Sequence, residues 1–160
     1  MNSRDFLRTM RINGKMLRHR MIGKAKLADY KLAYNAYSTV RQGGVLDIEQ
    51  CEGNHVIGIL YDLSEEALRR VDIREGSLYE RIIVEVNIDN RKVRAYTYIV
   101  KKKMKTKANI EYSGIVYKAM IEHEFPIEYV NDFVKTVRVS AYGSEENYFK
   151  YKEMKRKVIR

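Results

Sequence analysis

The chain has little of several residue types that mark common classes of protein. A single cysteine, Cys51, excludes an internal disulfide framework and is typical of a reducing compartment. No apolar run approaches the roughly 18 residues that predict a membrane-spanning helix. The opening stretch "MNSRDFLRTMRI" is charged from its fourth residue, which predicts no signal peptide. From these absences we expect a cytoplasmic protein without a membrane partner.

Metal-ligating and linker-forming residues are also sparse. The three histidines have no ligand-like spacing, so we expect no metal site: His19, His55 and His123. The chain contains one proline, Pro126, and no low-complexity segment. Its 160 residues, 45% of them hydrophobic, suffice for one core. We therefore predict one domain over residues 1–135, followed by a basic extension over residues 136–160.

The formal net charge of +10 arises from two basic runs, "KKKMKTK" (101–107) and the terminal "KYKEMKRKVIR". Such runs are more often solvated surface or tail than a binding site. A basic surface nevertheless raises the local concentration of anionic ligands. Because no zinc-knuckle, RNP or helix-turn-helix pattern is present, we do not expect a nucleic-acid partner, and we keep it only as a minor hypothesis from charge.

The order of the predicted elements is strands first and helices last. A glycine pair at 43–44 predicts a turn. Strands are predicted at 25–38, 55–63, 79–88 and 92–100, the last two joined by a tight "DNR" turn. Helices are predicted from Ser64 as N-cap over "SEEALRRV", over 109–125, and from Pro126 onward. This order indicates an α+β domain with a largely antiparallel sheet.

The stretch "VDIREGSLYERIIVEV" (71–86) contains the most suggestive corner of the chain. Glu75 follows a predicted helix and precedes Gly76 and a predicted strand. Functional groups are over-represented on such connections, and glycine lets the backbone turn sharply or lets a ligand approach it. Asp72 is expected to cap or brace this corner. The competing interpretation makes Glu75 an ordinary exposed acid.

Five motifs in order give the chain a resemblance to a known family. They are "GGVLDI" (43–48), "VIGILYDLSEEALRRVDIREG" (56–76), "YERIIVEV" (79–86), "AYTYIV" (95–100) and "FPIEYV" (125–130), with Tyr112 upstream of the last. The chain resembles the gamma-glutamylcyclotransferase-like proteins over most of residues 1–135. The resemblance implies a small, mostly antiparallel, β-barrel-like sheet flanked by helices, with a small cavity.

The resemblance also implies a reaction. The α-amine of a γ-glutamyl group attacks its own γ-carbonyl, 5-oxoproline forms, and the amine or amino acid held in the γ-amide leaves. Glu75 matches the family's proton-transfer acid, and a carboxylate can serve as base and then as acid. No metal or cofactor is expected, because the nucleophile is already tethered to its electrophile. The expected partner is a small γ-glutamyl substrate, and relatives differ in which γ-glutamyl compound they use.

Gly76 and three tyrosines are the expected substrate-binding residues. Tyr79, Tyr98 and Tyr112 match family positions whose side chains line the cavity. The chain has 13 tyrosines, so core packing with a solvated hydroxyl is the alternative for each.

The beginning of the chain departs from the family pattern. Family members start with a strand that runs into a Tyr-Gly-Ser-Asn loop, whose N–H groups hold the anionic end of the substrate. Here "MNSRDFLRTM" resembles the family segment that comes after that loop, so the first strand is expected to be missing. Two explanations are open. Either the start of this sequence is displaced downstream of the family's first strand and loop, or the protein is a catalytically impaired relative that binds a small ligand or a protein. The upstream coding sequence distinguishes the two.

A second Tyr-Gly-Ser occurs at Tyr142–Ser144, after a strand-like run in "VRVSAYGSEEN" (137–147). As in a circular permutation, this run is an alternative source of the missing strand. Glu145 stands where the family has asparagine, and its carboxylate would repel an anionic substrate. The sequence leaves the oligomeric state open, although an opened sheet edge would be prone to pair with another chain.

Overall fold

Residues 3–158 are described in the computed structural model, and they divide into two units. Unit 1 comprises the chain up to Ala33 together with Leu46–Lys103. Unit 2 comprises Tyr34–Val45 and the chain from Met104 onward. Two long strands, β3 and β4, each contribute residues to both units.

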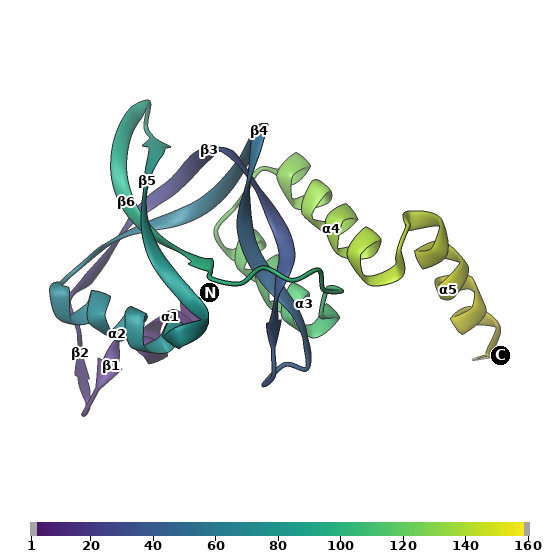
Figure 1. The fold of residues 1–160 in the computed structure, drawn as a ribbon, viewed down its shortest axis with the longest axis horizontal. Helices are drawn as coiled ribbons and strands as arrows, with labels where there is room; N and C mark the ends of the chain where they lie inside the picture. Colours follow the sequence, from purple (N-terminus) through teal and green to yellow (C-terminus); the bar gives the residue numbers. More distant parts are fainter. Residues whose placement is uncertain (1–2, 159–160) are drawn as a thin grey trace. The chain divides into compact units, whose positions relative to one another are not determined.

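Figure 1 shows the elements in chain order. They are α1 (Ser3–Thr9), β1 (Arg11–Ile12), β2 (Lys15–Met16), β3 (His19–Ser38), β4 (Gly43–Leu63), α2 (Glu65–Glu75), the 3-10 turn η1 (Gly76–Leu78), β5 (Tyr79–Ile88), β6 (Arg91–Val100), α3 (Ile110–Glu122), α4 (Ile127–Tyr142) and α5 (Glu145–Val158). The predicted α+β class with a largely antiparallel sheet is confirmed.

The main sheet has the strand order β4-β3-β5-β6. The predicted β5–β6 hairpin is present and pairs without interruption from Tyr79–Val100 to Ile88–Arg91, but its turn is one residue shorter than the predicted "DNR", because Arg91 belongs to β6. Asp89 and Asn90 at the turn have φ values of 47° and 58°, the two left-handed residues that a tight type I′ hairpin requires. The sheet is open, with β4 and β6 as its edges, so the expected "barrel-like" form describes it only loosely.

Unit 1 has two apolar clusters, and side chains of β5 or β6 contribute to each. One cluster contains Ala25, Leu27, Val86 and Ile88, with Val84 packed against it. The other brings α1 and α2 together through Phe6, Met10, Leu17, Ala67 and Val71, and Tyr98 of β6 packs against it. Successive residues of a strand point to opposite faces. Tyr98 and its cross-strand partner Arg81 therefore lie on the face opposite Val84 and Val86.

A buried carboxylate links the two edge strands of the sheet. Asp47 of β4 has a fully buried side chain, and its Oδ1 accepts a hydrogen bond of 3.2 Å from the backbone N–H of Val100 in β6. The Lys103 ammonium lies 4.0 Å from the other oxygen, Oδ2. Lys103 also donates to the backbone carbonyl of Ile48. The end of β6 is thus fastened to β4 by side chains.

In unit 2 the predicted turn at the glycine pair is wrong. Gly43 and Gly44 open strand β4, and the turn precedes them at residues 39–42. Gly44 exchanges backbone hydrogen bonds of 3.0 Å with the carbonyl of Lys107 and the N–H of Asn109. A Cβ at Gly44 would collide with that carbonyl oxygen and with the Thr106 hydroxyl. Close approach of residues 106–109 therefore explains the glycine.

Strands β3 and β4 and helices α3 and α4 all contribute buried apolar residues to unit 2. These residues include Tyr34, Ala36, Val45, Met120, Val130 and Phe133. The Tyr34 hydroxyl forms a 2.7 Å hydrogen bond with the Ser113 hydroxyl of α3, and burial raises the pKa of Tyr34 to about 12. Helix α3 begins at the Asn109 cap, whose side chain accepts from the N–H of Tyr112.

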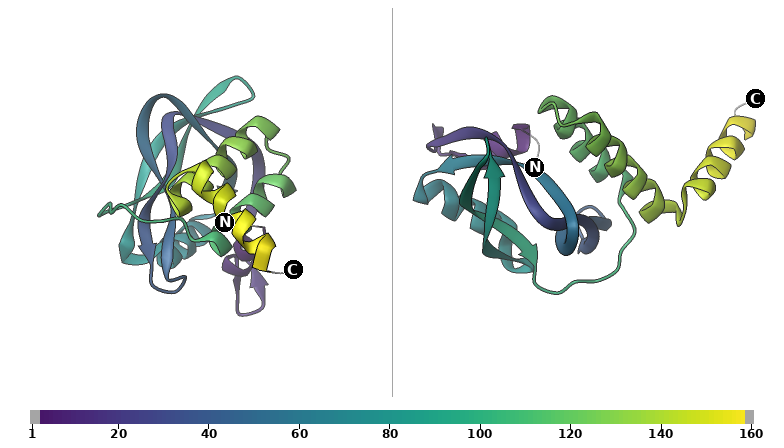
Figure 2. Two further views of the ribbon diagram at one scale, coloured as in Figure 1. Left: turned by 90° about the vertical axis from the view of Figure 1, so that its right-hand side faces the viewer. Right: turned by 90° about the horizontal axis from the view of Figure 1, so that it is seen from above.

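The strand-like run at 137–142 is helical, so it supplies no strand. It is the last part of α4, which ends at Gly143 with φ of 85°. The Ser144 hydroxyl then accepts from the N–H of Asn147 at the start of α5, and the two helices meet at a sharp bend (Figure 2). The predicted domain boundary at 135/136 falls inside α4 and stays a prediction.

Within residues 3–158, no helix is both long and apolar enough to cross a membrane.

We predict that Asp47→Ala lowers the free energy of unfolding by about 1–3 kcal/mol, because the buried N–H of Val100 loses its acceptor. Asp47→Asn keeps an acceptor oxygen and is expected to cost less. The matched control is Glu49→Ala on the same strand, which removes a surface ion pair with Lys31 and is expected to cost at most about 1 kcal/mol. Urea denaturation measures all three. Equal costs for Asp47→Ala and Glu49→Ala would contradict the edge-linking role.

Candidate functional site

Helix α2 carries the candidate proton-transfer residue and begins as the sequence predicts. The Ser64 hydroxyl accepts a hydrogen bond of 3.2 Å from the N–H of Ala67, which caps the helix. Glu65 and Glu66 occupy the first turn, where the helix dipole favours negative charge. The helix buries Ala67 and Val71 against α1. These contacts fix the helix on unit 1.

The helix ends at a glycine whose backbone conformation excludes other residues. Gly76 has φ of 65° and ψ of −156°, a combination that is essentially restricted to glycine. Its N–H donates to the carbonyl of Asp72 and closes the last turn. A Cβ at Gly76 would meet no atom within 4 Å, so the backbone angles, and not crowding, require glycine here.

Glu75 is the last residue of α2, which runs four residues beyond the predicted helix end at Val71, so Glu75 lies on the helix and not on the irregular connection that the sequence predicts. Its side chain is half-buried. Burial raises the pKa of the Glu75 carboxyl above its ordinary value, and the neighbouring Arg74 guanidinium opposes that rise. Arg74 itself donates to the Thr9 hydroxyl of α1. Burial outweighs the adjacent cation, so Glu75 is a stronger base than an exposed glutamate.

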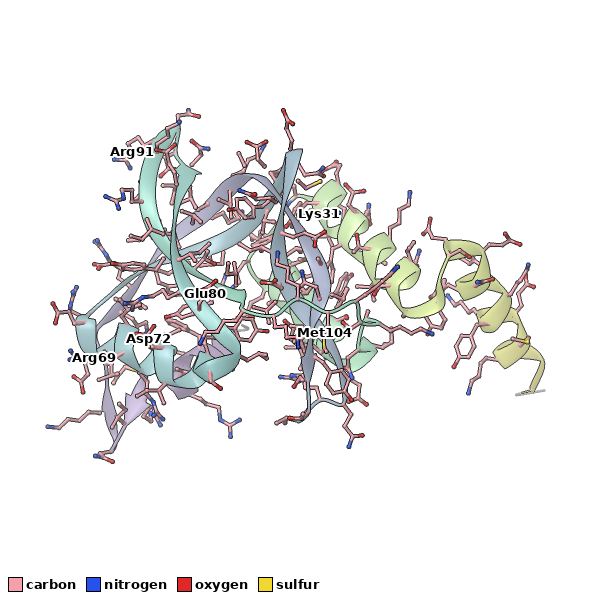
Figure 3. All side chains as sticks on the ribbon, in the orientation of Figure 1. Lys31, Arg69, Asp72, Glu80, Arg91 and Met104 are labelled. Carbon is pink, nitrogen blue, oxygen red and sulfur yellow. The ribbon has the colours of Figure 1, made fainter. Side chains whose placement is uncertain are left out.

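Asp72 lies one helical turn before Glu75 and bridges α2 to the hairpin (Figure 3). Its carboxylate accepts a hydrogen bond of 2.7 Å from the Tyr98 hydroxyl of β6. The Arg81 guanidinium of β5 donates to both carboxylate oxygens, at 2.9 and 3.2 Å. Burial and the Asp72 charge raise the pKa of Tyr98. The expectation that Asp72 braces this corner is in keeping with these contacts.

Arg81 is the residue of this corner that sequence reasoning missed. Its carbon Cζ lies 4.6 Å from the centre of the Tyr96 ring while its guanidinium binds Asp72. The predicted three-residue turn at 89–91 places Arg81 one position out of register with Tyr98, whereas in the structure the turn is Asp89–Asn90 and the two residues are cross-strand partners.

The other predicted site residues are divided between the two units. Tyr79 is the first residue of β5, opposite Val100, and next to the 3-10 turn that starts at Gly76. Glu75, Gly76, Tyr79 and Tyr98 all belong to unit 1. Tyr112 lies on α3 of unit 2, where the Arg41 guanidinium stacks over its ring at 5.1 Å. Among the described side chains, no group of three or more His, Cys, Asp or Glu could hold a metal ion.

The sequence matches a known protein family over most of its length. The model of the family described as gamma-glutamyl cyclotransferase, AIG2-like, matches residues 7–118, more than half of the chain. No curated protein matches the chain.

Three solved structures have a similar fold. One described as gamma-glutamyl cyclotransferase is 22% identical with a TM-score of 0.68, and the match covers 72% of this chain and 73% of that one. The uncharacterized protein loc79017 from Homo sapiens is 23% identical with a TM-score of 0.67 and the same two coverages. YkqA from Bacillus subtilis is 19% identical with a TM-score of 0.68, and the match covers 76% of this chain and 45% of YkqA. At these identities the likeness shows the fold alone.

The raised pKa of Glu75 predicts a pH dependence of stability that is independent of any activity. An acid with a raised folded pKa contributes stability that is fully present below its unfolded pKa of about 4.3 and is lost as the pH rises through the folded pKa. Glu75→Gln keeps the side chain neutral. We therefore expect the variant to gain stability relative to the wild type between about pH 4 and pH 7.

Urea denaturation at both pH values measures the difference, with Glu66→Gln in the exposed first turn of α2 as the control. A wild-type-to-Glu75→Gln difference that does not change with pH would contradict the burial of this carboxyl.

Proposed function

Because the chain belongs to the gamma-glutamyl cyclotransferase, AIG2-like family, we propose that it releases 5-oxoproline from a γ-glutamyl amine or γ-glutamyl amino acid, with Glu75 as the proton shuttle. The single observation that supports this proposal most is the partial burial of the Glu75 carboxyl, which raises its pKa. This carboxyl stands at a helix end whose backbone conformation only glycine adopts. Perturbed acids of this kind cluster at functional sites.

The proposed reaction needs one group that can both take and return a proton. The substrate's α-amine nitrogen attacks the γ-carbonyl carbon, and a bond forms that closes a five-membered ring. Glu75 accepts the proton that this nitrogen loses. The tetrahedral intermediate then collapses, the bond from carbon to the γ-amide nitrogen breaks, and Glu75 returns the proton to the departing amine. No electrons are transferred to another group, and the carboxylate ends as it began.

The raised pKa suits both halves of this cycle. A general base and acid is most effective when its pKa lies close to the working pH. An exposed glutamate is a weak base at neutral pH, whereas burial brings Glu75 closer to that range. Because the nucleophile and the electrophile belong to one molecule, the protein's main task is to hold them in the reactive orientation.

Substrate contacts are proposed for Gly76, Tyr79, Tyr98 and Tyr112. At Gly76 the space that a Cβ would occupy is open, so a substrate can approach the backbone there. The rings of Tyr79 and Tyr98 belong to the same unit as Glu75. The role of Tyr112 rests on the resemblance alone. The chain's net charge of +10 favours encounter with a substrate that carries a carboxylate.

We predict that Glu75→Gln lowers the rate of 5-oxoproline release by at least about 10²-fold, the usual contribution of a general acid–base group. Glutamine keeps the size and most of the hydrogen bonding of glutamate but cannot take and return a proton. The measurement is 5-oxoproline release from a panel of γ-glutamyl amino acids, γ-glutamyl peptides and γ-glutamyl amines. Glu66→Gln, an exposed acid in the first turn of the same helix, is the matched control.

Equal turnover by the wild type and Glu75→Gln would end the catalytic role of Glu75. If the wild type releases no 5-oxoproline from any member of the panel but binds one of them in calorimetry, the protein is a binding module and the enzymatic proposal is wrong.

A further inference from the structure

We propose that Asp72, held by the Tyr98 hydroxyl and the Arg81 guanidinium, is the positioning residue that orients Glu75 for proton transfer. This proposal deepens the function proposed above and rests on the role of Glu75 in it. Tyr98 and Arg81 act on the reaction through Asp72. The Tyr98 hydroxyl donates to Asp72 and not to the substrate, and its ring can line the site.

The geometry of α2 couples Asp72 to Glu75. Asp72 and Glu75 are three residues apart on α2, and residues at this spacing share one face of a helix. Both lie in the last turn, which the hydrogen bond from the Gly76 N–H to the Asp72 carbonyl closes. The main chain and the side chain of Asp72 are therefore both held at the point where Glu75 leaves the helix. Any rotation of this turn would move the two carboxyl groups together.

The Asp72 carboxylate is held by several polar contacts from the hairpin. Asp72 accepts three hydrogen bonds, one from β6 and two from β5, and all of them involve its carboxylate charge. Charge-assisted bonds of this kind are short and directional. The apolar packing of Ala67 and Val71 holds α2 on the sheet but leaves its rotation less defined. The hydrogen bonds of Asp72 fix the rotation of α2 at the C-terminal end of the helix.

The proton of the Tyr98 hydroxyl is already used in the bond to Asp72. A tyrosine hydroxyl has one proton to donate. Tyr98 donates it to Asp72 Oδ1 at 2.7 Å, and the raised pKa of Tyr98 keeps that proton in place. Only the lone pairs of the hydroxyl remain for other groups. A substrate carboxylate or carbonyl needs a donor, which Tyr98 cannot supply without breaking the bond to Asp72.

Arg81 offsets the negative charge that Asp72 places near Glu75. A bare Asp72 carboxylate one turn from Glu75 would disfavour the ionised form of Glu75, which has to act as the base. Arg81 lies 2.9 Å from Asp72 Oδ2 and offsets that charge. The guanidinium is in turn supported by the Tyr96 ring beneath it. The Asp72–Arg81 ion pair has no net charge. Asp72 can therefore orient Glu75 without disfavouring the ionised form of Glu75.

The test compares two tyrosine variants of one strand. Tyr98→Phe removes only the hydroxyl that holds Asp72. Tyr96→Phe is the matched control, because Tyr96 lies on the same face of β6 and no hydrogen bond of its hydroxyl is present among the described residues. For Tyr98→Phe we expect kcat to fall about 10-fold or more, since small displacements of a catalytic group are costly, while KM changes less than about 2-fold. For Tyr96→Phe we expect both constants to stay at the wild-type values.

Asp72→Asn is the second variant. Its amide oxygen still accepts from Tyr98, but the neutral side chain loses the charge-assisted bonds from Arg81. We expect kcat to fall and KM to stay. A rise in KM without a fall in kcat for Tyr98→Phe would show that the hydroxyl contacts the substrate, and would overturn the proposal. A lower melting temperature with unchanged kcat and KM would show that the hydrogen bond between Tyr98 and Asp72 only stabilises the fold, and would also overturn the proposal.

A readout without turnover separates this proposal from the proposed function. The pKa of the Glu75 carboxyl, followed by NMR titration of the folded protein, is expected to move towards the ordinary glutamate value in Tyr98→Phe, because the loosened turn admits water. It is expected to stay unchanged in Tyr96→Phe. An unchanged pKa in Tyr98→Phe would overturn the positioning role, whereas absence of 5-oxoproline release by the wild type would overturn only the proposed reaction.

Discussion

The carboxylate of Asp72 is the contact on which the geometry of the candidate site depends. It joins one helix to two strands, because it accepts from Tyr98 of β6 and from Arg81 of β5. Apolar packing between α1 and α2 brings the helix to the sheet, but such packing has little directional preference. Three hydrogen bonds to one carboxylate turn a loosely specified contact into a defined orientation. The position of Glu75 follows from that orientation.

The same corner shows how opposing electrostatic effects are resolved. Glu75 has a cation, Arg74, next to it in sequence, and this cation alone would make the carboxyl more acidic. Burial acts in the opposite direction and is the larger effect. Solvent exclusion at the helix end therefore makes this glutamate a stronger base than an exposed glutamate.

Local sequence signals predicted the parts of the fold that depend on neighbouring residues. Ser64 as a cap, the turn at Asp89–Asn90 and the two strands beside it were all predictable, because capping and hairpin chemistry act over a few residues. The end of the same helix was predicted at Val71, four residues too early, so Glu75 was expected on the connection and not on the helix. The contacts of Asp72 with Arg81 and Tyr98 were not predicted, because they depend on the exact hairpin register and on the packing of α2 against the hairpin.

Features that depend on distant contacts were not predictable. Gly44 resembled a turn residue, but the passage of Lys107 against a strand is what requires it. The valines at 137 and 139 favour a strand by propensity, yet they continue a helix whose preceding turns bury Val130 and Phe133. In both cases the decisive neighbour is far along the chain or is a whole packed helix, and no local pattern encodes it.

The shared strands β3 and β4 have a consequence for how the chain is made. Each unit is built from two segments, and the segments alternate along the sequence: unit 1, unit 2, unit 1, unit 2. During synthesis, Tyr34, Ala36 and Val45 leave the ribosome long before α3 and α4 exist to cover them. The apolar side chains at the tip of the β3–β4 hairpin therefore stay exposed until translation has passed residue 133. Such an interval is a point at which a nascent chain depends on chaperones to avoid aggregation.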